Sequence, residues 1–281
     1  MAEEEEFYLT LLSNSSMTYF PNNTTASFIT QLPKRLRLTG DWVVGLSEIH
    51  YPCTFKTVTE MDNLVYYRIN PVLSDAPPLE TVLEKATTYF IRDPKQIQYK
   101  EGGWFVIRLA TGNYESVEEI VSTLNKHELI SKLIKVKYNK TTKRVSITFE
   151  AAFTISILGF SQRLALQLGF RPDQNIKSEQ EAHHTASIWT GLPSQMFVYC
   201  DIVEPQIVGD VLTPLMRIVN IVIRNYYYGN HKDVVFSPTH YIPVMTKEFE
   251  NIEINIRTDT GALMPFELGT LSLKLHFKRR R

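Results

Sequence analysis

The final stretch of the chain, residues 249–281, contains two runs in which apolar and polar residues strictly alternate. The apolar positions of the two runs are Ile252, Ile254, Ile256, Leu271, Leu273, Leu275 and Phe277. Alternation with a period of two places all apolar side chains on one face of a β-strand. We expect an antiparallel pair, which needs a second sheet to cover its apolar face. The N-terminal run 7–11 supplies a matching strand, so the two ends of the chain predict a β-sandwich.

The segment between these runs contains the tetrapeptide Asp259-Thr260-Gly261-Ala262, which matches the catalytic motif of retroviral-type aspartic proteases. In those proteases two aspartates share a proton. Here Arg257 and Thr258 separate the motif from its strand, and the following segment 262–281 is too short to enclose a substrate. We therefore expect a tight turn in which Gly261 has a positive φ angle, and no enzyme activity.

Composition indicates a globular protein without a dominant charge. The chain has 281 residues, of which 43% are hydrophobic and 11% aromatic, and this allows one large domain or two smaller ones. Its 30 basic and 30 acidic residues cancel, so no global field steers it onto nucleic acid or an anionic membrane. An acidic run at 3–6 and a basic run of Lys278, Arg279, Arg280 and Arg281 occupy the two ends. Such runs are solvated tails or, alternatively, contacts for a polyanion.

The sequence contains no pattern typical of a metal, cofactor or nucleophile site. Cys53 and Cys200 lie far apart without CxxC spacing, so we expect buried structural thiols. The adjacent His183 and His184 would point to opposite faces of a strand and cannot readily share a metal. Neither a nucleotide-binding glycine motif nor a nucleophile elbow is found. With no signal-like N-terminus and no long apolar run, we expect a soluble protein of a reducing compartment, without a membrane span.

Patterns along the chain predict three segments. Strands at 7–12, 28–32, 36–52 and 64–69 assign residues 1–75 to the N-terminal part of the sandwich. After the linker-like run 74–78, residues 76–190 mix helix with strand and form an inserted α+β subdomain. Strands at 195–202 and 216–223, with the two alternating runs, assign residues 191–281 to the C-terminal part.

The inserted segment carries the clearest local signals. Ser116 and Glu119 form a capping box, and the helix that follows places Val117, Ile120 and Leu124 on one face. Strands are expected at 104–109, 133–138 and 144–149, and a second helix at 161–168 ends at Gly169. The sandwich around this insertion has about eight strands joined by long connections. The expected fold is therefore mainly β, a single jelly-roll β-sandwich with an inserted α+β subdomain.

A tyrosine-rich segment at 225–241 is the best candidate for a functional surface, because aromatic rings with polar tips are enriched where proteins bury surface against partners. We expect it to be an irregular loop. The candidate interface residues are Tyr226, Tyr227, Tyr228, Phe236 and Tyr241. The alternative is that these rings cover the open end of the protein's own sandwich.

Five blocks of sequence, in this order, carry a family resemblance. They are FYLTLLSNSSMTYFPNNT (7–24), LTGDWVVGLSEIHYP (38–52), TGNYESVEEI (111–120), LGF (168–170) and FENIEINIRTDTGALMPFELG (249–269). Together they resemble the minor capsid, or penton, protein of Polinton (Maverick) elements and the related adintoviruses. The resemblance extends over nearly the whole chain.

This resemblance implies a virion protein made in the host cytoplasm. Its jelly-roll subunits would form homopentamers at the fivefold capsid vertices, beside a double-jelly-roll major capsid protein. It implies no catalytic residue and no cofactor. The basic residues Lys278–Arg281 would then face packaged DNA or the partner capsid protein. Two alternatives remain: a lectin-like jelly-roll module that binds a ligand or receptor, and, less favoured, an enzyme built on this scaffold.

Overall fold

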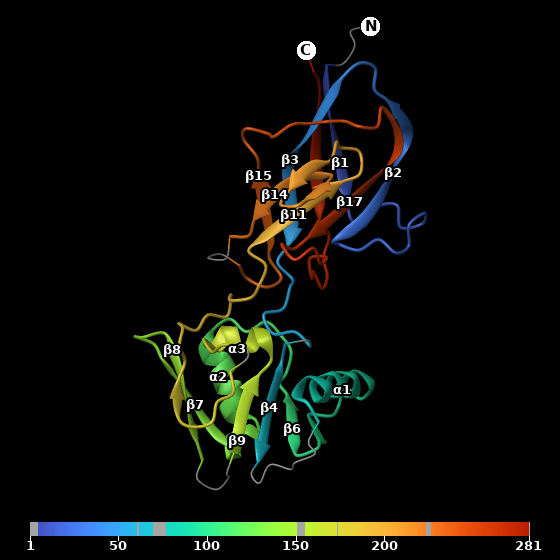
Figure 1. Ribbon diagram of the computed structural model, residues 1–281. Helices are drawn as coiled ribbons and strands as arrows, with labels where there is room; N and C mark the ends of the chain where they lie inside the picture. Colours follow the sequence, from blue (N-terminus) through green and yellow to red (C-terminus); the bar gives the residue numbers. More distant parts are fainter. Residues whose placement is uncertain are drawn as a thin grey trace. The chain divides into compact units, whose positions relative to one another are not determined.

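The computed structural model describes residues 5–60, 62–69, 77–150, 155–172, 174–222 and 226–280, and Figure 1 shows its helices and strands. The chain divides into two compact units. Unit 1 comprises Met1–Phe55 and Pro193–Arg281, and unit 2 comprises Lys56–Leu192. The two ends of the chain therefore fold together, as the alternating runs predict, and the middle of the chain forms a unit of its own.

Unit 1 is a sandwich of two antiparallel sheets. The strands of the first sheet, in order across it, are β1 (Glu6–Leu12), β18 (Ser272–Arg279), β3 (Trp42–Pro52) and β15 (His231–Val235), and the short β16 (Ile242–Pro243) also pairs with β3. The second sheet has the order β14 (Leu215–Asn220), β11 (Gln195–Cys200), β17 (Glu248–Arg257) and β2 (Ser27–Arg37). A separate hairpin consists of β12 (Gln206–Val208) and β13 (Val211–Thr213).

The order of neighbours in these sheets is that of a jelly roll. Counted along the chain among the described residues, the first sheet joins the first, eighth, third and sixth main strands of unit 1, and the second sheet joins the fifth, fourth, seventh and second. Consecutive strands thus alternate mostly between the sheets, as in a double Greek key. The mainly β, jelly-roll fold expected from the sequence is confirmed by this topology.

The two alternating C-terminal runs do not pair with each other, although an antiparallel pair was expected. β17 pairs with β11 and β2, whereas β18 pairs with β1 and β3, so the two strands belong to opposite sheets. Their apolar faces point toward each other, and the rings of Phe249 and Phe277 stack with centroids 6.2 Å apart. The expected pairing was wrong because alternation gives the buried face of a strand but not its neighbours.

Unit 2 has a sheet that is covered on both faces. In order across the sheet, its strands are β5 (Gln98–Glu101), β6 (Trp104–Arg108), β4 (Leu64–Ile69) and β9 (Ile155–Phe160). Helix α1 (Leu79–Arg92) packs on one face. The other face packs against α2 (Val117–Lys126), α3 (Gln162–Leu168) and a small sheet of β10 (Gln180–Glu181), β8 (Arg144–Phe149) and β7 (Ile134–Asn139), with the short helix η1 (Ile130–Lys132) beside it.

Strand β4 corrects the expected boundary of the sandwich. Residues 64–69 were expected in the N-terminal part of the jelly roll, 1–75, but they form β4, which pairs with β6 and β9 inside unit 2. Leu64 and Tyr66 face α1, while Val65 and Tyr67 face α2 and α3. A strand buried on both faces gives a continuous apolar run, and such a run does not reveal which sheet it joins. The units accordingly divide after Phe55 and after Leu192, instead of after 75 and 190.

The local signals of the insertion are largely confirmed. Helix α2 begins after Ser116, whose side-chain oxygen accepts from the backbone N–H of Glu119 at 3.2 Å. The Glu119 carboxylate accepts from the N–H of Glu115, one residue before the expected partner. Helix α3 ends at Gly169, which has a φ of 84°. Helix α1 was not expected from the sequence, because the pattern after the linker mixes helical and strand signals.

The side chain of Gln167 provides a test of how unit 2 is held together. Gln167 is fully buried in α3, and its amide nitrogen donates to the carbonyl oxygens of Thr57 and Ile188, both at 2.8 Å. Replacing it by methionine leaves both buried carbonyls without this donor. We expect Gln167→Met to lower the free energy of unfolding by about 1–3 kcal/mol, measured by urea denaturation.

The matched control is Gln162→Met in the exposed first turn of the same helix. Its free energy of unfolding should stay within about 0.5 kcal/mol of the unmodified protein. Equal stability of the two variants would contradict the role assigned to the Gln167 amide.

Candidate functional site

The tyrosine-rich segment is more ordered than the expected loop. Asn225 lies outside the described residues. Residues 226–241 include strand β15, which pairs with the edge of β3 from His231↔Pro52 to Val235↔Glu48. The five candidate interface residues therefore flank an edge strand and do not share one surface.

Tyr226 belongs to the interior of unit 1. It is buried, its ring lies 4.5 Å from that of Phe55, and its hydroxyl oxygen accepts from the backbone N–H of Phe55 at 3.0 Å. The same hydroxyl donates to the Phe55 carbonyl at 3.3 Å. Burial raises the pKa of the Tyr226 phenol above its ordinary value. Tyr226 therefore fits the alternative expectation, in which a ring covers the protein's own sandwich, and not the expectation of a partner interface.

Tyr241 and Phe236 also make contacts within unit 1. The Tyr241 hydroxyl lies 2.7 Å from Nδ1 of His276, and the two rings meet edge to face. The Arg217 guanidinium lies over the ring of Phe236, 4.3 Å from its centroid. Since Arg217 belongs to β14 and Phe236 follows β15, this cation–π contact joins the edges of the two sheets.

Tyr227 and Tyr228 remain as an exposed pair. Tyr227 is 62% exposed, and Tyr228 donates its hydroxyl proton to a carboxylate oxygen of Glu267 at 2.6 Å. Of the five residues named from the sequence, these two are the most available to a partner.

Lys278, Arg279 and Arg280 are not a free tail. Lys278 and Arg279 belong to β18 and pair with Val43 and Trp42, and the N–H of Arg280 donates to the carbonyl of Asp41. Arg281 lies outside the described residues. The side chains of Lys278 and Arg280 are exposed, so their charges face solvent even though their backbone is ordered.

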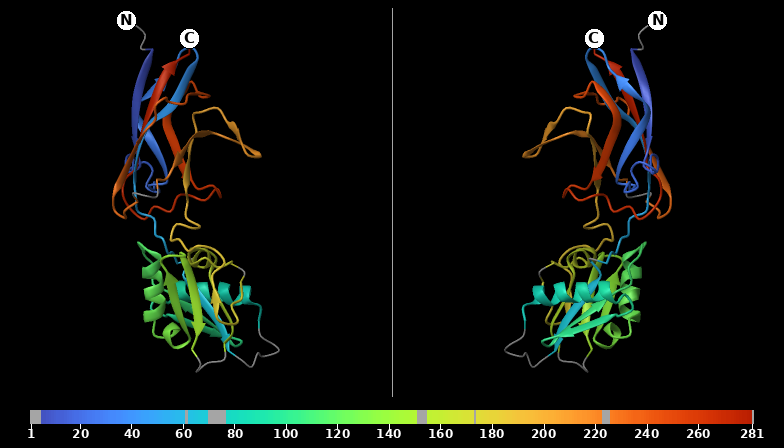
Figure 2. Two further views of the ribbon diagram at one scale, coloured as in Figure 1. Left: turned by 90° about the vertical axis from the view of Figure 1, so that its left-hand side faces the viewer. Right: turned by 90° about the vertical axis from the view of Figure 1, so that its right-hand side faces the viewer.

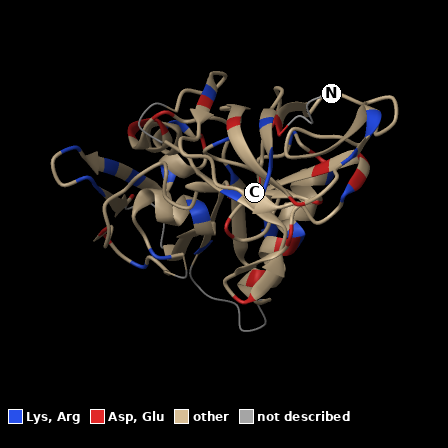
Figure 3. Cartoon of the chain, turned by 90° about the horizontal axis from the view of Figure 1, so that it is seen from above, with Lys and Arg blue, Asp and Glu red and all other residues tan. Residues whose placement is uncertain are grey.

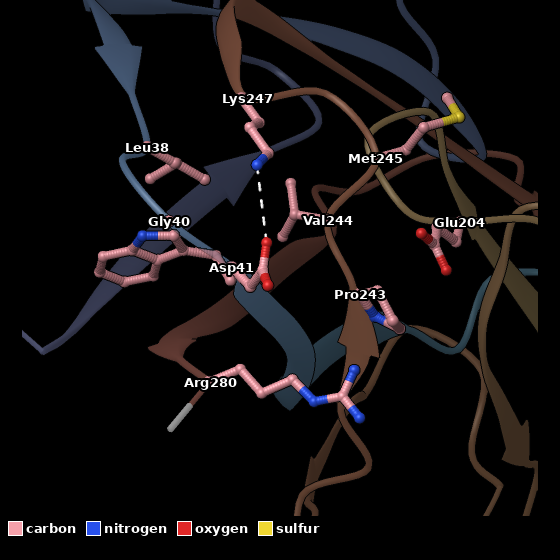
Figure 4. A pocket seen from close by; sticks show the side chains of 10 residues that line it. Leu38, Gly40, Asp41, Glu204, Pro243, Val244, Met245, Lys247 and Arg280 are labelled. Atoms are coloured by element: carbon pink, nitrogen blue, oxygen red, sulfur yellow. Dashed lines mark ion pairs between the residues drawn. The ribbon is translucent and has the colours of Figure 1, made fainter.

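Arg280 also lines a pocket of about 310 Å³ at this end of the sandwich (Figure 4). Lys247 and Asp41 form an ion pair of 3.6 Å in it, and Glu204 adds a second carboxylate. The lining therefore mixes both signs of charge, and Lys and Arg are interspersed with Asp and Glu elsewhere in the chain (Figure 3). A pocket with mixed charges does not by itself select a polyanion.

The motif around Asp259 forms the expected turn. The N–H of Thr258 donates to the carbonyl of Ala262 at 2.8 Å, and the guanidinium of Arg257 donates to the carbonyl of Gly261 at 2.7 Å. Gly261 has a φ of 83°, as expected, and the side chain of Asp259 is exposed. An exposed turn offers none of the enclosure that a proton-sharing aspartate pair requires.

The two cysteines lie in the interior, whereas the adjacent histidines His183 and His184 lie on the surface. Cys53 and Cys200 are both free and buried, and burial raises the pKa of both thiols. His183 and His184 are exposed. Within the described part of the chain, no group of three or more His, Cys, Asp or Glu residues is arranged to hold a metal ion. No helix in that part is long and apolar enough to cross a bilayer.

The structure also reveals a feature that the sequence reading missed. Residues 206–213 form the hairpin of β12 and β13, which carries the exposed apolar residues Ile207, Val211 and Leu212. A Gly-Asp dipeptide between two β-prone pairs, Ile207-Val208 and Val211-Leu212, is the signal that could have predicted it.

A groove at the β1 and β2 edge of unit 1 was likewise not visible in the sequence. Its volume is about 390 Å³. Its lining is apolar with a basic rim and comprises Phe7, Leu9, Leu36, Leu38, Thr39, Trp42, Lys34, Arg37 and Arg279. The lining comes from four strands and the loop after β2, so only the folded sandwich assembles it.

No protein-family model matches the sequence, and no curated protein matches it. The structure is similar to that of the mavirus penton protein, with 13% identity and a TM-score of 0.48, covering 98% of this chain and 99% of that chain. It is also similar to a chain in the cryo-EM structure of the Sputnik virophage, with 11% identity and a TM-score of 0.45, covering 99% and 98%. At these values the two likenesses do not assign a function.

The contrast between Tyr226 and Tyr227 gives a direct test of the site. Tyr226→Phe removes the hydroxyl that serves both backbone groups of Phe55, so we expect it to lower the free energy of unfolding by about 1–3 kcal/mol. Tyr227→Phe changes an exposed side chain, and its effect should stay within about 0.5 kcal/mol. Chemical denaturation of both variants makes the measurement, and a larger loss for Tyr227→Phe would contradict this placement.

Proposed function

We propose that this chain is a structural subunit of a virus capsid, the minor capsid or penton subunit, and that five copies form a ring at each icosahedral vertex. The observation that carries the proposal is the jelly-roll order of strands in unit 1, with unit 2 inserted between its third and fourth main strands. The five sequence blocks that resemble the penton proteins of Polinton elements and adintoviruses fall in both units. The proposed role is also the one that the name of the mavirus protein states.

The physical properties of the chain suit such a ring. A sandwich has two lateral edges that differ from each other, and a contact between unlike surfaces of identical subunits closes into a ring when the rotation allows. The 30 basic and 30 acidic residues cancel, so five copies approach without net repulsion. We propose the capsid vertex as the location, a double-jelly-roll major capsid protein as the neighbour, and no catalytic activity.

The mass of the purified protein tests the proposal. One chain has a mass of 32.5 kDa, and we expect native mass spectrometry and negative-stain images to show rings of five copies. A stable monomer or trimer over the whole concentration range would contradict the proposal and favour a module that binds a ligand or receptor.

The exposed charges of Lys278 and Arg280 support a second part of the proposal, contact with packaged DNA or with an acidic surface of the partner capsid protein. Lys278 belongs to β18 and Arg280 directly follows it, so removing the whole basic run would damage that strand. Substitutions that remove only the side-chain charges test the contact without this damage.

We expect Lys278→Gln with Arg280→Gln to preserve pentamer formation and lower the DNA content of assembled particles. The control is Lys126→Gln with Lys132→Gln in unit 2, which removes the same number of charges. Particles would be quantified by absorbance at 260 and 280 nm. Unchanged DNA content in the first variant, or an equal loss in both, rules out a specific role for these two residues in DNA contact.

A further inference from the structure

The β12–β13 hairpin presents an apolar surface that the rest of its own unit leaves uncovered. Ile207 and Leu212 are directly opposite each other in the hairpin and are 83% and 70% exposed. Val211, on the other face, is also exposed. In both views of Figure 2 this hairpin, drawn in gold, projects away from the two sheets of the sandwich.

Such a hairpin is unlike an ordinary surface turn. An isolated two-stranded ribbon is only marginally stable in water, and apolar side chains that face water contribute no burial free energy to it. Contiguous exposed apolar residues on a projecting element mark a site that another surface covers. The base of the hairpin is fixed, because the Gln206 side-chain amide donates to the carbonyl of Leu215 at 2.7 Å. The hairpin is therefore presented in a defined position.

The groove at the β1 and β2 edge is an uncovered apolar surface of the same unit. Phe7, Leu9 and Leu11 lie on the inward face of β1, but only Leu11 is buried. Phe7 and Leu9 instead line an open groove together with Leu36 of β2. The volume of about 390 Å³ lies within the range of pockets that bind small organic groups.

The charges of the hairpin and the groove are complementary. Asp210 lies at the hairpin tip, is exposed, and has no ion-pair partner within the described residues. Lys34 on the groove rim is exposed and is likewise not paired with any residue that the structure describes. Arg37 and Arg279 add positive charge to the rim, although Arg37 also pairs with Glu248 at 3.1 Å. An acidic apolar tip and a basic apolar groove are suited to each other.

We propose that the hairpin of one copy of this chain docks into the groove of the next copy, with Ile207 and Leu212 against the apolar lining and Asp210 against Lys34. The contact joins two different surfaces, so each copy uses its hairpin on one side and its groove on the other. Such heterologous contacts close into a ring when the rotation between neighbouring copies allows it. The inference rests on the proposed function, in which copies of this chain assemble, and it names the surfaces through which they meet.

The first experiment removes the apolar contact. Ile207→Asp with Leu212→Asp should raise the protein concentration at half-assembly at least tenfold in sedimentation velocity, because charges then enter the groove. Both side chains are exposed, so the thermal unfolding of the monomer should not change. The control is Ile91→Asp on α1, where the side chain is 66% exposed, and it should assemble like the unmodified protein.

The second experiment reverses the charges. Asp210→Lys and Lys34→Glu should each raise the concentration at half-assembly, and the double variant should restore it to within about threefold of the unmodified protein. Restoration by a second substitution is specific to residues that meet.

The outcomes separate this inference from the proposed function. If the unmodified protein forms pentamers and the apolar variant does too, the docking contact is overturned while the penton role stands. If the apolar variant dissociates but the double charge reversal restores nothing, the groove is overturned as the docking site. If the unmodified protein remains a monomer at every concentration, both the contact and the pentamer are overturned.

Discussion

The packing of β17 against β18 across the sandwich is the interaction on which unit 1 depends. Ile252, Ile254 and Ile256 of one strand, and Leu273, Leu275 and Phe277 of the other, have no exposed surface. Complete burial of a large apolar side chain contributes about 1.5–3 kcal/mol relative to exposure. Each strand is an interior strand of its own sheet, so the same residues also fix the pairing of β1, β3, β11 and β2. A charge placed in either row would therefore disturb both sheets together.

This arrangement explains why a whole unit can be inserted into the sandwich. The chain leaves unit 1 after β3 and returns at β11, which belong to different sheets. Unit 2 has its own two-faced sheet, with α1 on one side and α2 and α3 on the other, and it buries its apolar residues without help from the sandwich. The insertion therefore adds surface without requiring new partners in the core of unit 1.

The folding of unit 1 also decides which aromatic and charged residues are buried and which are exposed. The Tyr226 hydroxyl bonds to the backbone of Phe55, and the Tyr241 hydroxyl lies beside His276. Tyr226 is therefore buried, whereas its neighbour Tyr227 is exposed. At the β1 and β2 edge an apolar groove remains open. The β12–β13 hairpin is the complementary feature, an apolar projection with an acidic tip. A subunit with one projection and one groove has the asymmetry that a ring of identical copies needs.

The sequence by itself determined the buried face of each alternating strand, the helix caps at Ser116 and Gly169, the turn at Gly261 and the jelly-roll class. These features depend on residues close together in the chain, whose periodicity and turn chemistry act locally. Only the tertiary structure decided that β17 and β18 face each other, that β4 belongs to unit 2, and which tyrosines remain exposed. It also assembled the groove from four strands and the loop after β2. Strand pairing and burial join residues far apart in sequence, and a period of two or a continuous apolar run is compatible with many such partners.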